Sequence, residues 1–302
     1  MAIQHNLQMS FLVLSPPLSG ADRRGTISAK TLKAYKGQLL SADWRSRPSG
    51  ALVAKLSRES RQRIEHLALE ISAMAAVYPV DWALLKAPYR WRDYSVLAMD
   101  MDSTVITIEC IDEIADFCGK KSEVSAITEA AMRGEIKDYA ESLRRRVALL
   151  AGLDAGVLQE VIRYRPKFTP GVKALVDTAN ANGLHTLLVS GGFVQFTDFV
   201  SKKIGFAQTR SNTLEIIDGK LTGKVVGHIV DATVKAQTVA AACKTLGVST
   251  QRAITVGDGA NDLKMMMASG LSIAHRAKPA VAAQADQAIR VGGLDNVLDW
   301  FE

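Results

Sequence analysis

The pattern of apolar and polar positions divides the chain near residues 86–92, where a proline and several charges interrupt it. Before this segment, short apolar runs and two stretches of helical spacing predict six elements in the order βαββαβ. They are expected at Leu7–Ser15, Ser28–Lys36, Leu39–Arg45, Ala51–Leu56, Arg58–Val77 and Val80–Leu85. This order predicts a small α+β domain over residues 1–88.

From residue 94 onward, strands alternate with helices, which is typical of an α/β domain with a parallel sheet, here residues 94–302. Single strands are predicted at Ser95–Met99, Thr186–Val189, Ala253–Val256, Ser272–Ala274 and Ala288–Val291. A hairpin is predicted around Asp218-Gly219. Helices are predicted from Thr169-Pro170 to Asn182-Gly183 and at Phe193–Ile204, Val234–Leu246 and Asp262–Ala268. Three more helices, Glu113–Cys118, Glu123–Met132 and Asp138–Leu150, have no strand between them. They indicate a helical insertion over about residues 110–165.

Composition narrows the class of protein. With 48% apolar residues in 302, the chain can bury a sizeable core, and no apolar run approaches the ~18 residues that cross a bilayer. Without a recognisable export signal, a cytoplasmic location is expected. The three cysteines lack the spacing of a metal site. Residues 1–99 carry a net charge of +7 and the remainder −1, but the basic residues are scattered, so a solvated surface is favoured over nucleic-acid binding.

Polar clusters follow three of the predicted strands directly. They are the segments 100–104, 190–192 and 257–262, with the sequences Asp-Met-Asp-Ser-Thr, Ser-Gly-Gly and Gly-Asp-Gly-Ala-Asn-Asp. Open parallel sheets bind ligands beyond the carboxyl ends of their strands. If these strands are neighbours, four carboxylates, a hydroxyl and several glycine amides converge at one place.

Such a cluster needs a cation, and all-oxygen ligation suits Mg²⁺. A metal with glycine amides and a hydroxyl is suited to neutralising a phosphate group, and Lys235 could add a positive charge. Each part alone has a simpler explanation: Asp-x-Asp and Ser-Gly are common in turns, and a single lysine usually lies on a solvated helix face. Their conjunction at strand ends, in this order, indicates function.

These motifs resemble those of the haloacid dehalogenase superfamily: D-x-D-x-T, Ser-Gly, Lys and G-D-G-x-x-D, in that order. The segments 109–115, 142–147 and 218–223 extend the resemblance to the phosphoserine phosphatase family. The resemblance covers about residues 94–302. It implies a Rossmann-like core with a helical cap, about residues 110–165. It also implies a Mg²⁺-dependent enzyme that hydrolyses O-phospho-L-serine to L-serine and phosphate, the last step of serine biosynthesis.

The resemblance further implies the roles of individual residues. Asp100 attacks phosphorus and forms an aspartyl-phosphate, and Asp102 acts as general acid and then general base. Crowding by Asp100 and the phosphate should raise the pKa of Asp102. Mg²⁺ is ligated by Asp100, the backbone carbonyl of Asp102, and Asp258, with Asp262 supporting the site.

The resemblance also implies which residues bind each part of the substrate. Ser190, Gly191 and Lys235 would bind the phosphate, and Asn261 would line the pocket. Glu109 suits the ammonium group of the substrate and Arg146 its carboxylate. The neighbouring Arg144 or Arg145 could take the role of Arg146 if the match to the family is displaced by one or two positions. The apolar side of the pocket is assigned to Met132 and Tyr139.

Two other functions remain open: a phosphotransferase or phosphatase for another small phosphate ester, and a catalytically silent ligand-binding regulator. The first domain resembles ferredoxin-like and ACT-like regulatory domains. It is expected to serve regulation or to supply homodimer contacts. A small-molecule substrate is expected, without nucleic-acid or membrane partners.

Overall fold

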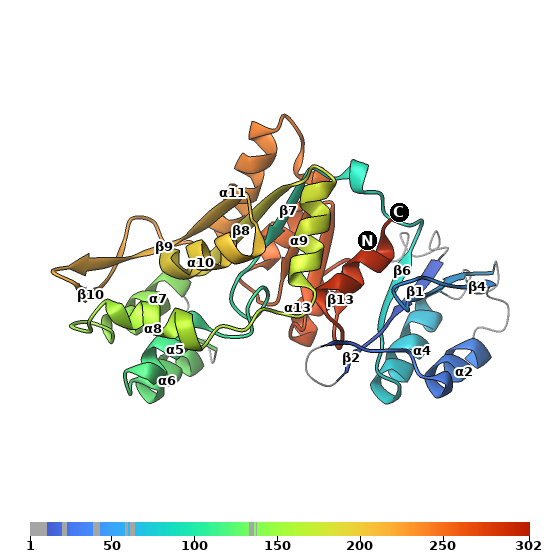
Figure 1. Cartoon of the computed structure of the whole chain (residues 1–302), viewed down its shortest axis with the longest axis horizontal. Helices are drawn as coiled ribbons and strands as arrows, with labels where there is room; N and C mark the ends of the chain where they lie inside the picture. The colour runs from blue at the N-terminus through green and yellow to red at the C-terminus, as the bar shows by residue number, and fades with distance from the viewer. Residues whose placement is uncertain are drawn as a thin grey trace.

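The computed structural model describes residues 11–19, 23–38, 43–57, 60, 64–132, 136 and 138–302. A four-stranded and a seven-stranded sheet dominate the fold. Figure 1 shows the small sheet at one end, the large sheet in the middle, and the helical insertion with the β9–β10 hairpin at the other end. No helix among the described residues is both long and apolar enough to cross a membrane.

The small sheet has the predicted βαββαβ core. Its strands are β1 (Phe11–Ser15), β4 (Asp43–Ser46), β5 (Leu52–Lys55) and β6 (Asp81–Leu85), and its helices are α2 (Ala29–Gln38) and α4 (Ile64–Val77). The order β4-β5-β1-β6, with every neighbouring pair antiparallel, is that of a ferredoxin-like sheet. A short pair, β2 (Leu18–Ser19) with β3 (Arg23–Arg24), follows β1. The predicted starts of three elements, residues 7–10, 39–42 and 58–63, fall largely outside the described residues.

Both faces of this small sheet are covered. Leu12 and Leu14 of β1 pack with Ile71 of α4, whereas Val13 joins the core that contains Trp300 near the C-terminus. Alternate residues of a strand point to opposite faces, so β1 is buried on both sides. The sequence pattern predicted the strand but did not show that its second face is covered by the end of the same chain.

The seven-stranded sheet has the order β10-β9-β8-β7-β11-β12-β13 and is parallel except for the β9–β10 pair. Its strands are β7 (Val96–Met99), β8 (His185–Phe193), β9 (Gln208–Ile217), β10 (Lys220–Val226), β11 (Ala253–Gly257), β12 (Leu271–His275) and β13 (Gln287–Ile289). The α/β prediction is therefore confirmed. The prediction for β8 was too short, because this strand continues through the Ser-Gly-Gly segment.

Helices cover both faces of the large sheet. One core holds Leu97 and Met99 of β7 together with α9 (Val172–Ala181) and α10 (Val194–Ile204). The other holds Val96 and Ala98 together with α11 (Ala232–Thr245) and α12 (Leu263–Ala268). The other described elements of this part of the chain are the short α13 (Pro279–Ala282) and the 3₁₀ helices η1 (Trp91–Asp93), η2 (Thr250–Arg252) and η3 (Leu294–Trp300). Burial on both faces of the sheet explains why the core strands read as continuous apolar runs.

Among the described residues, the helical insertion contains four helices where three were predicted. They are α5 (Cys110–Phe117), α6 (Lys121–Met132), α7 (Tyr139–Ala148) and α8 (Gly156–Tyr164). The unpredicted α8 begins at a glycine, which is a poor helix former, and Asp154 just before it accepts a hydrogen bond from the Gly156 amide at 2.8 Å. The Thr169-Pro170 start of α9 was wrong: the helix begins at Val172, after Gly171 in a left-handed conformation.

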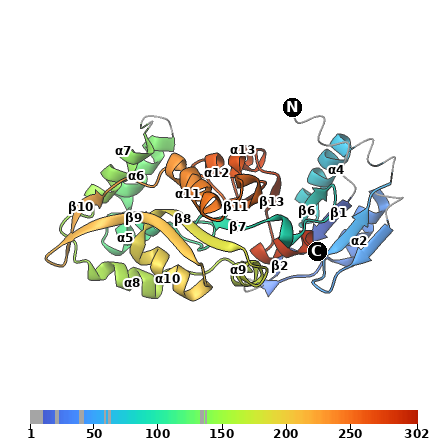
Figure 2. The ribbon, with the colours of Figure 1, turned by 90° about the horizontal axis from the view of Figure 1, so that it is seen from above.

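The small sheet is joined to the large one by a buried polar network. Asp81 of β6 accepts hydrogen bonds from the backbone amides of Arg290, Val291 and Gly292, at 2.6, 3.0 and 2.7 Å. The Asn296 side-chain amide donates to the same carboxylate at 2.9 Å. The loop after β13 thus encloses a carboxylate of β6, in accord with the adjacent placement of β6, β13 and η3 in Figure 2.

Candidate active site

Three adjacent strands bring the predicted polar clusters together. In the order β8-β7-β11, Met99 pairs with Leu188 on one side and Val256 on the other, so the residues that follow reach the same edge. The backbone amide of Asp100 donates to the carbonyl of Val256 at 3.0 Å. β7 is also where the strand order reverses, the position at which open α/β sheets bind ligands.

Lys235 stands between two of the predicted carboxylates. Its Nζ lies 2.8 Å from Oδ1 of Asp100 and 2.8 Å from Oδ1 of Asp262, and all three side chains are buried. Burial alone would lower the lysine pKa, but the two carboxylates outweigh burial and raise it. Lys235 is therefore a buried cation, placed by α11, whose N-cap Asp231 accepts from the Val234 amide at 2.8 Å.

An oxygen-rich group lies beside this lysine. Carboxylate oxygens of Asp100, Asp258 and Asp262 lie within 4.8 Å of one another. Asp262 uses Oδ1 for Lys235 and Oδ2 for the amides of Asp258 and Gly259, at 3.1 and 3.0 Å. Both carboxylate oxygens of Asp262 already accept hydrogen bonds, so this residue stabilises the loop after β11. Asp100 and Asp258 each keep a carboxylate oxygen available for Mg²⁺.

The environment of Asp102 favours the protonated acid. Burial, followed by the negative charge of Glu109, raises the pKa of Asp102 to about 7. The Cys110 thiol donates to Oδ1 of Asp102 at 2.9 Å and opposes this shift. The pKa of Asp102 is raised, as predicted. The causes in this structure are burial and the charge of Glu109, whereas crowding by Asp100 and the phosphate had been expected.

The Ser190-Gly191-Gly192 segment forms an irregular end to β8. The register with β9 shifts between Val189 and Phe193, and Ser190 Oγ accepts from the Gly192 amide at 2.8 Å. A Cβ atom on Gly191 would collide with the hydroxyl of Tyr139. This glycine therefore lets the cap residue Tyr139 approach the predicted phosphate-binding loop.

The predicted substrate residues of the cap have different surroundings. Glu109 accepts a hydrogen bond from Ser103 Oγ at 2.7 Å, and the charge of Arg146 acts on Glu109. Arg146 is half-buried with Nε 3.4 Å from the Ser142 carbonyl, whereas Arg144 is exposed. Arg145 is exposed too and pairs with Glu141.

The remaining pocket residues are less fully defined. Tyr139 is half-buried, and burial raises its pKa to about 12. Asn261 lies in the loop after β11 with its side chain beside Gly259. The side chain of Met132 falls outside the described part of the chain, so its predicted place in the pocket stays a prediction.

Two residues near the site were missed by the sequence reasoning. Cys110 was considered only as one of three cysteines without the spacing of a metal site, yet its thiol contacts Asp102. His275 ends β12, is buried, and lies beside the backbone of Ser103 without a well-formed hydrogen bond from either ring nitrogen among the described residues. Burial, then the charge of Arg276, lowers the pKa of His275 to about 4, so its imidazole is neutral. No spacing in the sequence marks either contact. The position of His275 depends on the strand order β7-β11-β12, and the Cys110 contact depends on how the segment between β7 and α5 folds back.

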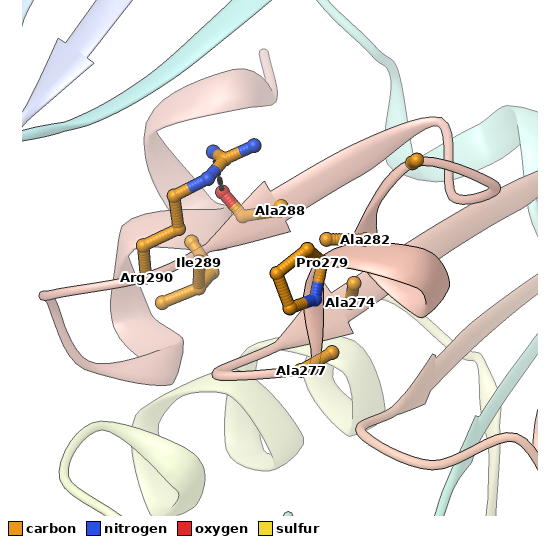
Figure 3. A pocket seen from close by; sticks show the side chains of 8 residues that line it. Ala274, Ala277, Pro279, Ala282, Ala288, Ile289 and Arg290 are labelled. Atoms are coloured by element: carbon orange, nitrogen blue, oxygen red, sulfur yellow. Dashed lines mark hydrogen bonds between the residues drawn. The ribbon is translucent and has the colours of Figure 1, made fainter. Parts of the chain in front are cut away.

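A separate hollow of about 350 Å³ lies away from the carboxylates. Figure 3 shows it between β12, α13 and β13, with alanines, a proline and Arg290 around it. Arg290 is directed to the Ala288 carbonyl and lies 5.3 Å from the centre of the Trp82 ring. Its lining has none of the residues predicted for chemistry, so the candidate active site is the carboxylate cluster at the sheet edge.

Comparison with known proteins identifies the class. A family model described as haloacid dehalogenase-like hydrolase matches residues 97–267. The chain therefore belongs to the family of haloacid dehalogenase-like hydrolases, and the resemblance indicated by its motifs is confirmed.

Among individual proteins, the chain is similar to several phosphoserine phosphatases. The chain is 51% identical over 219 residues to a phosphoserine phosphatase of Albidiferax ferrireducens, covering 71% of this chain and 92% of the relative. A crystal structure of a probable phosphoserine phosphatase from Vibrio cholerae is 33% identical with a TM-score of 0.78, covering 98% of this chain and 87% of that one. A structure of a phospho-aspartyl intermediate analogue of phosphoserine phosphatase is 34% identical with a TM-score of 0.64, covering 69% and 99%.

Proposed function

We propose that this protein is a Mg²⁺-dependent phosphoserine phosphatase, which hydrolyses O-phospho-L-serine to L-serine and phosphate through an aspartyl-phosphate. One observation carries the proposal: Asp100, buried at a strand end, contacts Lys235 and lies beside the carboxylate of Asp258. The similarity to phosphoserine phosphatases, including one solved as a phospho-aspartyl intermediate analogue, supports the assignment.

The proposed reaction uses two carboxyl groups in turn. Asp100 attacks phosphorus while the bond from phosphorus to the serine oxygen breaks, and protonated Asp102 gives its proton to the leaving oxygen. A water molecule then attacks the phosphorus of the aspartyl-phosphate and gives a proton to Asp102. The bond from phosphorus to the Asp100 oxygen breaks, which releases phosphate and restores the Asp100 carboxylate. A pKa near 7 allows Asp102 to serve in both directions.

Charge neutralisation is shared by the protein and the metal. Mg²⁺, held by Asp100, Asp258 and the Asp102 carbonyl, would offset the phosphate charge. Lys235 keeps Asp100 and Asp262 in place and is positioned to attract a phosphoryl oxygen, while Ser190 and the Gly191 amide offer hydrogen bonds. Before Mg²⁺ binds, burial and the charge of Asp262 raise the pKa of Asp100 despite the opposing charge of Lys235, which disfavours its ionisation.

Recognition of the amino-acid part is assigned to the cap. The Glu109 carboxylate pairs with the substrate ammonium, and Arg146 binds the carboxylate bidentately. Arg146 is preferred to its neighbours because it is half-buried on the side where its charge reaches Glu109. Tyr139, with the hydroxyl close to Gly191, closes the pocket beside the phosphate.

The test is a phosphate-release screen with purified full-length protein. Phosphoserine, phosphothreonine, sugar phosphates and an aryl phosphate are compared with Mg²⁺ present, and Asp100→Asn is the blank. Preference for phosphoserine supports the proposal. Preference for a sugar phosphate favours the broader phosphatase, transfer to added homoserine favours a phosphotransferase, and no phosphate release favours a ligand-binding regulator.

We further propose a domain boundary between residues 88 and 94, with the first domain serving regulation or homodimer contacts. The Albidiferax relative aligns with 71% of this chain, as expected if the catalytic part is a unit by itself. A cytoplasmic location and a small-molecule substrate without nucleic-acid partners stay predictions.

A further inference from the structure

We propose that Gly223 is a positioning residue that fixes helix α7, and through it Arg146, relative to the phosphate site. This inference rests on the proposed phosphoserine phosphatase function. It concerns the 218–223 segment, which the resemblance includes but to which the proposed mechanism gives no role. The β9–β10 hairpin would then support α7, the helix of the cap that carries Arg146, and fix its position.

The hairpin is rigidly connected to the core sheet. β9 pairs in parallel with β8, the strand that carries Ser190, and β10 pairs with β9 in antiparallel fashion. At the turn, Asp218 and Gly219 both have positive φ, 50° and 74°, as a type I′ hairpin requires. The hairpin therefore extends the same sheet that bears the predicted phosphate-binding loop.

The outer edge of β10 is bound to the cap. The Gly152 amide donates to the Leu221 carbonyl, and the Leu221 amide donates to the Leu153 carbonyl, both at 2.8 Å. The Ala155 amide donates to the Gly219 carbonyl at 2.8 Å. Figures 1 and 2 both place α7 alongside β10. The segment that follows α7, residues 152–155, is thus bound to the free edge of β10 and to the turn before it by backbone hydrogen bonds.

Gly223 packs directly against the end of α7 and the residues that follow it. A Cβ atom there would lie 2.9 Å from Cβ of Ala151 and 3.2 Å from both Cα and the carbonyl oxygen of Ala148. Two of these three are backbone atoms, which cannot rotate away. The strand is also irregular at this position, since its register with β9 shifts between Leu221 and Val225. Alanine at 223 must therefore displace α7 or the hairpin.

A displacement of α7 would reach the substrate site. Ala148 is the last residue of α7 and lies two positions after Arg146, while Tyr139, next to Gly191, is the first. Moving the helix against the sheet would misplace the guanidinium relative to Ser190. A misplacement of about 1 Å can cost roughly 100-fold in rate or affinity.

Matched glycines separate this effect from backbone strain. Gly223 has φ +80°, and Gly227 has φ +75° with no neighbouring atom within 4 Å of the place that an added methyl group would take. Gly219 at the turn is similarly open, with φ +74°. Alanine at any of the three adopts an unfavourable φ, but only at 223 does it also collide with the cap.

The experiment compares Gly223→Ala with Gly227→Ala and Gly219→Ala, on phosphoserine and on an aryl phosphate that lacks the amino and carboxyl groups. We expect Gly223→Ala to raise KM for phosphoserine by about 10- to 100-fold. Its kcat/KM for the aryl phosphate should fall less than that for phosphoserine, and both parameters of the control variants should change by less than about threefold. In an Arg146→Ala background, Gly223→Ala should add little further loss, since both changes remove the same contact.

Hydrogen exchange gives a readout that needs no substrate. Amides of α7 should exchange faster in Gly223→Ala than in Gly227→Ala. Equal exchange in the two variants, or equal kinetic losses on both substrates, would overturn the positioning role. A wild-type enzyme without preference for phosphoserine would overturn the proposed function instead, while the exchange comparison would still decide whether Gly223 holds α7.

Discussion

The ammonium group of Lys235 lies 2.8 Å from Oδ1 of Asp100, and both side chains are buried. A buried carboxylate requires a partner, because its desolvation is otherwise too costly. One lysine serves Asp100 and Asp262 together, and Asp258 adds a third carboxylate. The excess negative charge favours a bound cation at this edge, and the cation together with Lys235 would attract a phosphate group.

Replacing this lysine should damage both stability and catalysis. Lys235→Met leaves two buried carboxylates without their cation, which typically costs about 3–5 kcal/mol of unfolding free energy. Urea denaturation measures this loss, and phosphate release should also fall by orders of magnitude. Lys264→Met is the control, because Lys264 is exposed and its ammonium group donates to the hydroxyl of Thr233 at the surface. Equal stability of the two variants would contradict the buried ion pairs.

His275 should make the protein sensitive to mild acid. Its folded-state pKa of about 4 lies below the unfolded value of 6.5, so protons bind the unfolded chain first as pH falls. This contribution to stability is complete above pH 6.5 and is lost progressively toward pH 4, on the order of 3 kcal/mol in all.

The check for His275 is a comparison of urea denaturation at pH 7.5 and pH 5. His275→Phe should lose less stability between the two pH values than the wild type. His228→Phe, a substitution at an exposed position, is the control. An identical pH dependence in wild type and His275→Phe would show that the imidazole is not the responsible group.

Arg146→Ala should impair phosphoserine selectively. Loss of a charge-assisted bidentate contact costs on the order of 2–4 kcal/mol, or roughly 30- to 1000-fold in kcat/KM. Hydrolysis of an aryl phosphate should decline far less, because that substrate has no carboxylate. Arg144→Ala, a change at an exposed neighbour, should leave both substrates nearly unaffected. If Arg144→Ala shows the selective loss instead, the carboxylate-binding role belongs to Arg144 and not to Arg146.

Asp81 should hold the first domain on the catalytic part. The Asp81 carboxylate accepts hydrogen bonds from three backbone amides and from Asn296. Asp81→Asn removes this negative charge and places an NH₂ group, itself a donor, opposite these donors. We expect a loss of about 2–3 kcal/mol in unfolding free energy with kcat on phosphoserine nearly unchanged at 25 °C. Asp43→Asn, at an exposed position, should be neutral. A stable Asp81→Asn protein would show that the apolar contacts of Val13 and Trp300 suffice for docking.

Much of the fold followed from local pattern. Asp218-Gly219 marked the hairpin because few other pairs accept two positive φ values. Two of the three polar clusters marked the ends of β7 and β11, whereas β8 continues through the third. The convergence of Asp100 with Asp258 and Asp262 was predicted on the condition that their strands are neighbours, and the strand order meets this condition. The hairpin and the polar clusters themselves depend on residues close in sequence.

Other features depend on contacts that no local pattern encodes. The second buried face of β1 is made by residues near Trp300, and the loop around Asp81 comes from more than 200 positions later in the chain. The raised pKa of Asp102 reflects burial by the cap and the charge of Glu109. Helix α8 was missed because its first residue is a glycine, so the usual sign of a helix start was absent.

The central claim is that the phosphoryl group passes through Asp100, and trapping that intermediate tests it most directly. Wild-type protein is mixed with phosphoserine and Mg²⁺, quenched in acid within a single turnover, digested and analysed by mass spectrometry. The account predicts one phosphoryl group on the peptide that contains Asp100, absent after omission of Mg²⁺ and absent in Asp100→Asn, which should release no phosphate. Phosphorylation of a different residue, or sustained turnover by Asp100→Asn, would contradict it.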